Sequence, residues 1–172
     1  MPMQDFDAID LKILKHLQRD ASLSNVELAA RVGLSPSPCL TRVKQLEATG
    51  VISRRVALLD PVHLGSALSV FIHVALEKQT EPRLQAFEKS MANLPEVMEC
   101  YLMSGDSDYL LRVVVRDVVA LQQFIVDKLA KTSGVANIRS SFALKQVKYN
   151  TELPIETLVN LKLGKSRPRN PR

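Results

Sequence analysis

Apolar side chains recur every three or four positions in three short runs near the start of the chain, the spacing typical of amphipathic helices. Asp7 can cap the first helix, and Ser24 with Glu27 forms a capping box before the second. Gly33 ends the second helix, and Pro36 falls in the first turn of the third. The residues predicted to face the core are Ile9, Ile13, Leu14 and Leu17, then Val26, Ala29 and Val32, then Leu40, Val43 and Leu46.

The connection between the second and third helices is only three residues long, residues 33–35. A turn this short makes two helices cross steeply, so a small residue is needed where they touch and a glycine where the chain reverses. Ala29 and Gly33 stand at these positions. The spacing occurs by chance in other helical hairpins, but basic residues on the following helix favour a helix-turn-helix.

Residues 51–59 are predicted to form a strand or a short ribbon, which Asp60 and Pro61 stop. This strand is either a wing of the helix-turn-helix or a linker to the next domain. A domain boundary is predicted within residues 63–66.

The second half of the chain alternates strand and helix patterns in the order β-α-β-β-α-β, which is the ferredoxin-like arrangement. The whole chain is therefore predicted to be α+β. The predicted elements are a strand over 68–76, a helix from Thr80 to Leu94, strands over 97–103 and 109–115 joined by a hairpin turn over 104–108, a helix from Asp117 to near Gly134 bearing Val118, Leu121, Ile125 and Leu129, and a strand over 135–149.

Composition narrows the protein class. The chain has 172 residues, 46% of them hydrophobic, and a net charge of +5. About +1 falls on residues 1–65, +1 on 66–150 and +3 on 151–172, so bulk charge says little about either domain. No apolar run approaches the ~20 residues of a membrane span, and the acidic first ten residues do not resemble a signal peptide. Two cysteines predict reduced thiols in a cytoplasm, and the end from Leu163 onward predicts a disordered basic tail.

The third helix carries the candidates for contact with double-stranded DNA. A helix N-terminus and serine hydroxyls can bind phosphate, and Arg and Gln side chains can pair with guanine and adenine edges. An ordinary solvated helix face is the alternative interpretation. The candidate DNA-binding residues are Asn25, Ser35, Ser37, Pro38, Thr41, Arg42, Lys44 and Gln45, with Arg54 and Arg55 as phosphate contacts.

Catalytic chemistry finds little support, so no enzyme activity and no cofactor is predicted. Asp106, Asp108 and Tyr109 could form an acid–base site, but acids in a glycine-containing hairpin are more often turn formers. The three histidines lack the spacing of metal ligands. Cys39 lies where helix amides could lower the pKa of its thiol, yet Cys39 and Cys100 have no neighbouring base and are predicted to be packing residues.

Several ordered motifs resemble the Lrp/AsnC (feast/famine) family of bacterial and archaeal transcription regulators. The likeness covers about residues 5–150, and residues 25–40 resemble the leucine-responsive branch. The matching motifs are Asp7-Ala8-Ile9-Asp10, Asn25-Val26-Glu27-Leu28-Ala29, Arg31-Val32-Gly33-Leu34-Ser35, Pro36-Ser37-Pro38-Cys39-Leu40, Gly50-Val51-Ile52, Leu59-Asp60-Pro61 and Ser104-Gly105-Asp106-Ser107-Asp108-Tyr109-Leu110-Leu111.

The resemblance implies a winged helix-turn-helix at 5–65 that includes a hinge strand, and an effector-binding and oligomerisation domain at 66–150. A C-terminal segment at 151–172 follows, and its end from Lys165 onward is not part of the family pattern. It further implies dimers formed through the sheet, assembly toward octamers, and an amino acid bound between dimers. The implied effector contacts are Leu102, Gly105, Asp106, Asp108 and Tyr109, with Ser141 in the last strand. Arg54-Arg55 replaces the Gly-Tyr found in many members, which puts the usual packing of the wing in doubt.

These observations predict a cytoplasmic, sequence-specific transcription regulator whose assembly and DNA binding respond to a small amino acid such as leucine. The alternatives are an architectural nucleoid protein without an effector and an amino-acid-binding regulatory subunit of an enzyme. The identity of the amino acid, the target genes and the direction of regulation stay open at this point.

Overall fold

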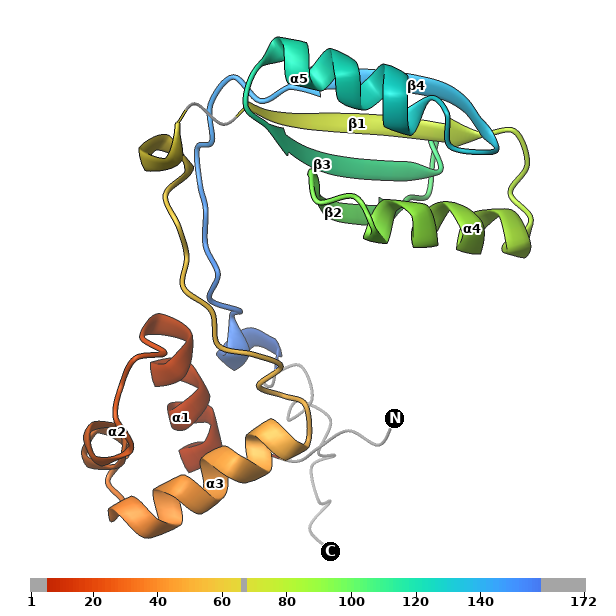
Figure 1. Cartoon of the computed structure of the whole chain (residues 1–172). Helices are drawn as coiled ribbons and strands as arrows, with labels where there is room; N and C mark the ends of the chain where they lie inside the picture. Colours follow the sequence, from red (N-terminus) through yellow and green to blue (C-terminus); the bar gives the residue numbers. More distant parts are fainter. Residues whose placement is uncertain (1–5, 66–67, 159–172) are drawn as a thin grey trace, which may run out of the picture. The chain divides into compact units, whose positions relative to one another are not determined.

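The chain divides into two compact units in the computed structural model, which describes residues 6–65 and 68–158 (Figure 1). One unit joins Met1–Leu58 to Lys148–Arg172, and the other is Leu59–Val147. Residues 148–158 thus belong with the N-terminal helices, whereas the sequence suggested a separate C-terminal segment over 151–172. The tail predicted from Leu163 onward lies outside the described residues.

Three helices make up most of the first unit: α1 (Ala8–Arg19), α2 (Asn25–Val32) and α3 (Pro36–Ala48). Both predicted N-terminal caps are confirmed, since Asp7 accepts hydrogen bonds from the amides of Ile9 and Asp10, and Ser24 with Glu27 forms a capping box. Gly33 ends α2 in the left-handed conformation, with φ +77°, so the predicted turn between the two helices is confirmed.

The core of the first unit differs from the predicted stripe at two positions. Val26 and Leu40 are exposed, and Leu28 and Cys39 occupy the buried positions instead. The apolar spacing of each helix allows two neighbouring stripes, and only the packing of three helices selects one of them. The buried residues of this core are Ile13, Leu14, Leu17, Leu23, Leu28, Ala29, Val32, Cys39, Val43 and Leu46.

The strand predicted for residues 51–59 is wrong. Residues 53–60 carry no regular secondary structure, because no other strand of the described chain pairs with their backbone. The amide of Ile52 instead donates to the carbonyl of Leu46 at the end of α3. A short 3₁₀ turn, η1 (Pro61–Leu64), follows the extended segment.

The second unit is a four-stranded antiparallel sheet with strand order β2-β3-β1-β4, which confirms the predicted ferredoxin-like topology (Figure 1). Alternation along β1 and β3 buries every second residue, as a strand covered on one face requires. The elements are β1 (Leu68–Leu76), α4 (Glu81–Ala92), β2 (Val97–Leu102), β3 (Tyr109–Val115), α5 (Val118–Gln123), the π-helical segment η2 (Phe124–Leu129) and β4 (Val135–Phe142).

Helices α4 and α5 pack on the same face of this sheet. Phe87 and Met91 of α4, and Leu121 of α5 with Phe124 of η2, join the buried alternating residues of β1 and β3 in one core. No helix among the described residues packs on the other face, where Phe71 and Leu110 project. One face of the sheet is thus left uncovered.

The end of the second unit differs from the prediction in two respects. The last strand stops at Phe142 rather than at Tyr149, because Phe142 pairs with Val70 and β1 itself begins two residues before that. Val118 is exposed because it is the first residue of α5, and the side of this helix that faces the sheet begins at Leu121. Within the described residues, every helix is too short or too polar to cross a lipid bilayer.

Candidate nucleic-acid interface and effector site

The solvent-facing side of α3 presents a row of polar side chains opposite its buried Cys39, Val43 and Leu46. Ser35 caps the helix but its side chain makes no capping hydrogen bond, so its hydroxyl is not committed to the helix. The predicted DNA-binding residues that this exposed side brings together are Ser35, Ser37, Pro38, Thr41, Lys44 and Gln45.

Two of the predicted DNA-binding side chains instead hold the helices together. The Nδ2 of Asn25, at the start of α2, donates to the carbonyl of Pro36 in α3 at 2.8 Å. Ala29 is buried at the contact between these helices, as the short connection requires. Asn25 therefore fixes the angle at which α3 is presented.

Arg42 is the second such side chain, and it ties α3 to the start of α1. Its Nη1 lies 2.6 Å from Oδ2 of Asp7 and 2.8 Å from Oδ1 of Asp10. These hydrogen bonds raise the pKa of Arg42, chiefly through Asp10. The pKa of Asp7 is lowered, first by the amide of Asp10 that it caps and then by Arg42. The Nη1 of Arg42 is therefore occupied within the unit.

The remaining basic residues predicted to contact DNA fall into two kinds. Nη2 of Arg55 forms an ion pair with Glu47 at 2.9 Å, which occupies it within the unit. Lys44 and Arg54 are exposed and have no ion-pair partner in the part of the chain that the structure describes. Of the predicted DNA-binding residues, these two therefore have charges that are free to bind phosphate.

Cys39 is a packing residue, as predicted. Its side chain is fully buried, and desolvation raises the pKa of its thiol rather than lowering it. The start of α3 thus lacks a reactive thiolate at this position. Cys100 is exposed and is also a free thiol, so its predicted role as a packing residue is wrong.

The C-terminal segment of the first unit contributes contacts that sequence reasoning missed. Lys15 pairs with Glu156 at 2.7 Å, Arg19 pairs with Glu152 at 3.1 Å, and the Gln18 side chain bonds both backbone groups of Leu153. An apolar hollow of about 490 Å³ lies in the same unit, with α1, residues 51–58 and residues 151–158 among its walls. Its lining includes Leu14, Leu17, Val56, Leu58, Leu153 and Ile155. In the sequence, only the opposite charges of Lys15 and Arg19 and of Glu152 and Glu156 could have indicated these contacts.

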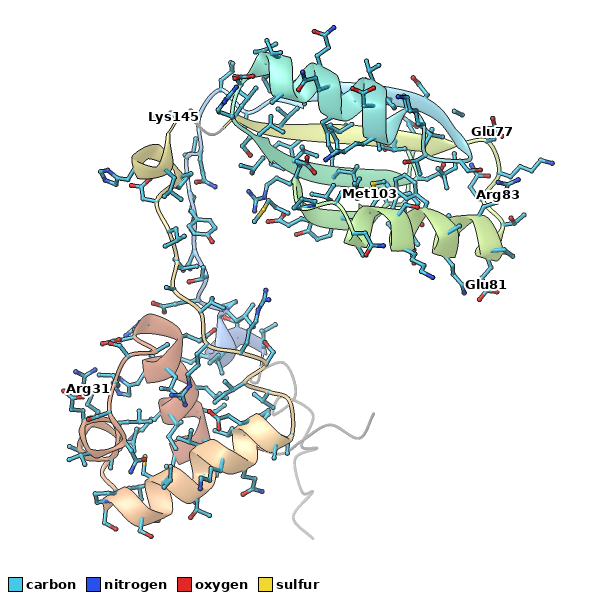
Figure 2. The ribbon with its side chains drawn as sticks, viewed as in Figure 1. Arg31, Glu77, Glu81, Arg83, Met103 and Lys145 are labelled. Carbon is cyan, nitrogen blue, oxygen red and sulfur yellow. The ribbon has the colours of Figure 1, made fainter. Side chains whose placement is uncertain are left out.

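In the second unit, the β2–β3 turn is built around Asp108. Its Oδ2 accepts a 2.7 Å hydrogen bond from the amide of Leu76, and its own amide donates to Val74. Gly105 adopts φ +141°, which favours glycine. Met103, labelled in Figure 2, starts the turn by donating its amide to the Asp108 carbonyl. The Asp108 carboxylate thus anchors the turn to the end of β1.

Tyr109 does not offer its side chain to a ligand. The ring is buried 4.6 Å from Phe87, and its hydroxyl donates to Glu88 of α4 at 2.9 Å. Burial and the Glu88 carboxylate raise the pKa of the phenol well above its usual range. The predicted effector contact is therefore corrected for this side chain, which belongs to the core.

The other predicted effector residues are exposed but do not all meet within one chain. Leu102, Gly105 and Asp106 lie at the turn, which bonds to Val74 and Leu76. Ser141 pairs with Phe71, three to five residues earlier on β1, or roughly 10–17 Å along the strand. Ser141 and the turn thus lie at different ends of the sheet. Within the described residues, no cluster of histidine, cysteine or acidic side chains could hold a metal ion.

Comparison with known proteins follows the same division of the chain. Residues 6–53 match the sequence model described as "Winged helix-turn-helix DNA-binding", and residues 69–153 match "Lrp/AsnC ligand binding domain". The Bkd operon transcriptional regulator of Pseudomonas aeruginosa is 47% identical over 89% of this chain and 100% of its own. The leucine-responsive regulatory protein of Escherichia coli K12 is 41% identical over 91% and 95% of the two chains. A crystal structure of a Neisseria meningitidis transcriptional regulator in complex with L-Met superposes with a TM-score of 0.84 at 41% identity, covering 90% of this chain and 99% of that one.

Proposed function

Because the chain belongs to the Lrp/AsnC family of DNA-binding transcription regulators, we propose that it presents the exposed side of α3 to the DNA major groove and that a small amino acid bound to its second unit controls that binding. The observation that carries the proposal is the arrangement of α3 itself. One side packs into the helical core through Cys39, Val43 and Leu46, and the other side exposes hydroxyl groups, the amide of Gln45 and the ammonium group of Lys44 to solvent.

The proposed contacts to DNA are of two kinds, contacts to phosphate and contacts to base edges. The hydroxyls of Ser35 and Ser37 lie at the start of α3, where the positive end of the helix dipole favours phosphate. Pro36 and Pro38 have no N–H, so the serine hydroxyls are the main donors at this end of the helix. Gln45 can pair with an adenine edge, and the unpaired Lys44 and Arg54 add sequence-independent attraction to phosphate. Thr41 and Pro38 complete the face, whereas Asn25, Arg42 and Arg55 act by holding it in position.

An apolar amino acid is the proposed effector. Two similar regulators support this choice, since one is named leucine-responsive and the other was solved with L-Met. In this chain the exposed Leu102, Gly105 and Asp106 surround a turn held rigid by Asp108. Ser141 reaches such a site only from a second chain, because its own turn lies at the other end of β1.

Self-association is part of the proposal. The uncovered face of the sheet bears Phe71, Leu110 and Val114, and burying it against a second copy removes apolar surface from water. A two-fold dimer places two recognition helices in major grooves about 34 Å apart. Dimers that assemble further, toward an octamer, hold several such helices on one DNA segment in the cytoplasm.

Neither alternative function is favoured. The relatives and both matching domains are those of non-enzymatic transcription regulators, which argues against a regulatory subunit of an enzyme. An architectural protein without an effector needs no ligand-binding domain, yet that domain covers residues 69–153. A screen of effectors separates this alternative from our proposal.

Fluorescence anisotropy with the full chain tests the proposal. Duplexes selected from a random pool are titrated at several salt concentrations, with and without each of the twenty amino acids. We expect tighter binding to selected than to random duplexes, and a change in affinity or assembly with at least one apolar amino acid. Lys44→Ala weakens binding to both kinds of duplex and reduces the salt slope by about 1, whereas Lys89→Ala on α4 leaves both unchanged. Equal effects of the two variants would contradict the role given to α3.

A further inference from the structure

An apolar side chain interrupts the polar face of α3. Leu40 is 42% exposed, although its neighbour Cys39 is fully buried and Val43 nearly so. Leu40 is also absent from the partly buried apolar residues that pack against this core. It follows Ser37 by three positions and precedes Lys44 by four, so all three share one side of the helix.

Thr41 adds a second apolar group beside Leu40. Its hydroxyl donates to the carbonyl of Ser37 at 3.2 Å, one turn earlier in α3. A threonine hydroxyl that bonds the helix backbone is less available to a base, which leaves its methyl group as the distinctive feature of its exposed surface. Methyl groups of Leu40 and Thr41 thus lie between the hydroxyl of Ser37 and the ammonium of Lys44.

Arginine is the side chain that most often binds a guanine edge, but Arg42 is engaged in ion pairs within the unit. Arg42 keeps its guanidinium on Asp7 and Asp10, as described above. In the major groove, the 5-methyl group of thymine is the apolar feature among base edges otherwise distinguished by hydrogen-bond donors and acceptors. Apolar side chains at the centre of a groove-facing helix match that methyl group.

We propose that Leu40 contacts the 5-methyl group of a thymine in the major groove and thereby selects an A·T pair at that position. This inference rests on the proposed role of α3 in DNA binding. The contact removes two apolar surfaces from water at once, which is favourable in proportion to the area covered. Cytosine lacks the methyl group, so a C·G pair at the same position leaves the Leu40 side chain facing a bare ring edge.

Replacement of thymine by deoxyuridine tests the contact, because it deletes the methyl group and leaves base pairing unchanged. A duplex enriched from a random pool by the full chain is remade with each thymine replaced in turn, symmetrically in both half-sites. The dissociation constants of the wild type, Leu40→Ala and the control Val119→Ala are measured for every duplex. Val119 is an equally apolar exposed residue, but it lies on α5 in the second unit.

We expect one thymine per half-site at which deoxyuridine weakens wild-type binding about two- to fivefold. Leu40→Ala binds the original duplex more weakly and loses nothing further on that replacement, while Val119→Ala behaves as the wild type. Since Leu40 is exposed, its variant keeps the thermal midpoint of the wild type, and this excludes a loss of folding as the cause.

Two results would overturn the proposal and leave the function of α3 intact. Either no single thymine is sensitive to the loss of its methyl group, or Leu40→Ala and the wild type lose the same factor at the sensitive position. Failure to enrich any duplex from the pool is a different result, because it overturns the proposed DNA binding itself.

Discussion

The guanidinium of Arg42 in α3 is bound to the carboxylate of Asp10 in α1, with Nη1 2.8 Å from Oδ1. Asp7, the N-cap of α1, accepts from the same nitrogen. A single side chain of α3 thus ties this helix to the start of α1. The residue that the sequence pointed to as a reader of guanine is part of the frame that orients the other contacts.

The stability of the first unit will depend on pH through Asp7. Its pKa is lower in the folded chain than its ordinary value of 3.8, so the carboxylate stabilises the fold above that pH and loses this contribution as pH falls through the folded-state value. As the pH is lowered below 3.8, we expect the thermal midpoint to fall more steeply in the wild type than in Asp7→Asn, which keeps a capping side chain but cannot titrate. Parallel curves from calorimetry would contradict this.

Tyr109 will prove to be a structural residue. Tyr109→Phe removes the hydrogen bond to Glu88 but retains the packing on Phe87, so the free energy of unfolding should fall by about 1 kcal/mol. Urea denaturation measures this loss. Calorimetric titration with leucine and methionine should give affinities within about twofold of the wild type, because a buried ring cannot touch the ligand. A tenfold loss of affinity in Tyr109→Phe would contradict this prediction and would indicate that Tyr109 contacts the ligand.

Replacing Asp106 or Asp108 in the β2–β3 turn should have very different effects on the stability of the protein. Asp108→Ala leaves the partly buried amide of Leu76 without its acceptor and should cost about 1–3 kcal/mol. Asp106→Ala changes an exposed side chain and should stay within about 0.5 kcal/mol of the wild type. Urea denaturation of both variants checks the difference. Equal losses would mean that the bond to Leu76 does not anchor the turn.

The C-terminal segment will stabilise the helical unit mainly through its apolar contacts. Ile155 packs against the core of that unit, so Ile155→Ala should lower the free energy of unfolding by about 1 kcal/mol. Leu144→Ala is the matched control, since that side chain is 97% exposed. The exposed pairs of Lys15 and Arg19 with this segment should contribute little, so raising the salt concentration should not reproduce the effect of Ile155→Ala. Equal losses in the two alanine variants would contradict the assignment.

The spacing of apolar residues within α2 and within α3 allowed two different buried faces for each helix, and the packing of the three helices selects one. In α3, Leu40 or Cys39 could complete a stripe with Val43 and Leu46, and in α2 either Val26 or Leu28 could do so with Ala29 and Val32. Hydrophobicity favoured Leu40 over Cys39 and spacing favoured Val26. In the three-helix core, Cys39 and Leu28 are buried instead, which leaves Leu40 and Val26 exposed to solvent.

The sequence by itself determined the features that depend on near neighbours: the capped helices, the glycine turn between α2 and α3, and the β-α-β-β-α-β order of the second unit. Tertiary structure decided which charged and apolar groups remained free for a partner. The pairing of Arg42 with Asp7 and Asp10, the burial of Tyr109 on Phe87, and the return of residues 148–158 to the first unit all join positions far apart in the chain. Such contacts depend on how complete elements pack together, which local spacing does not encode.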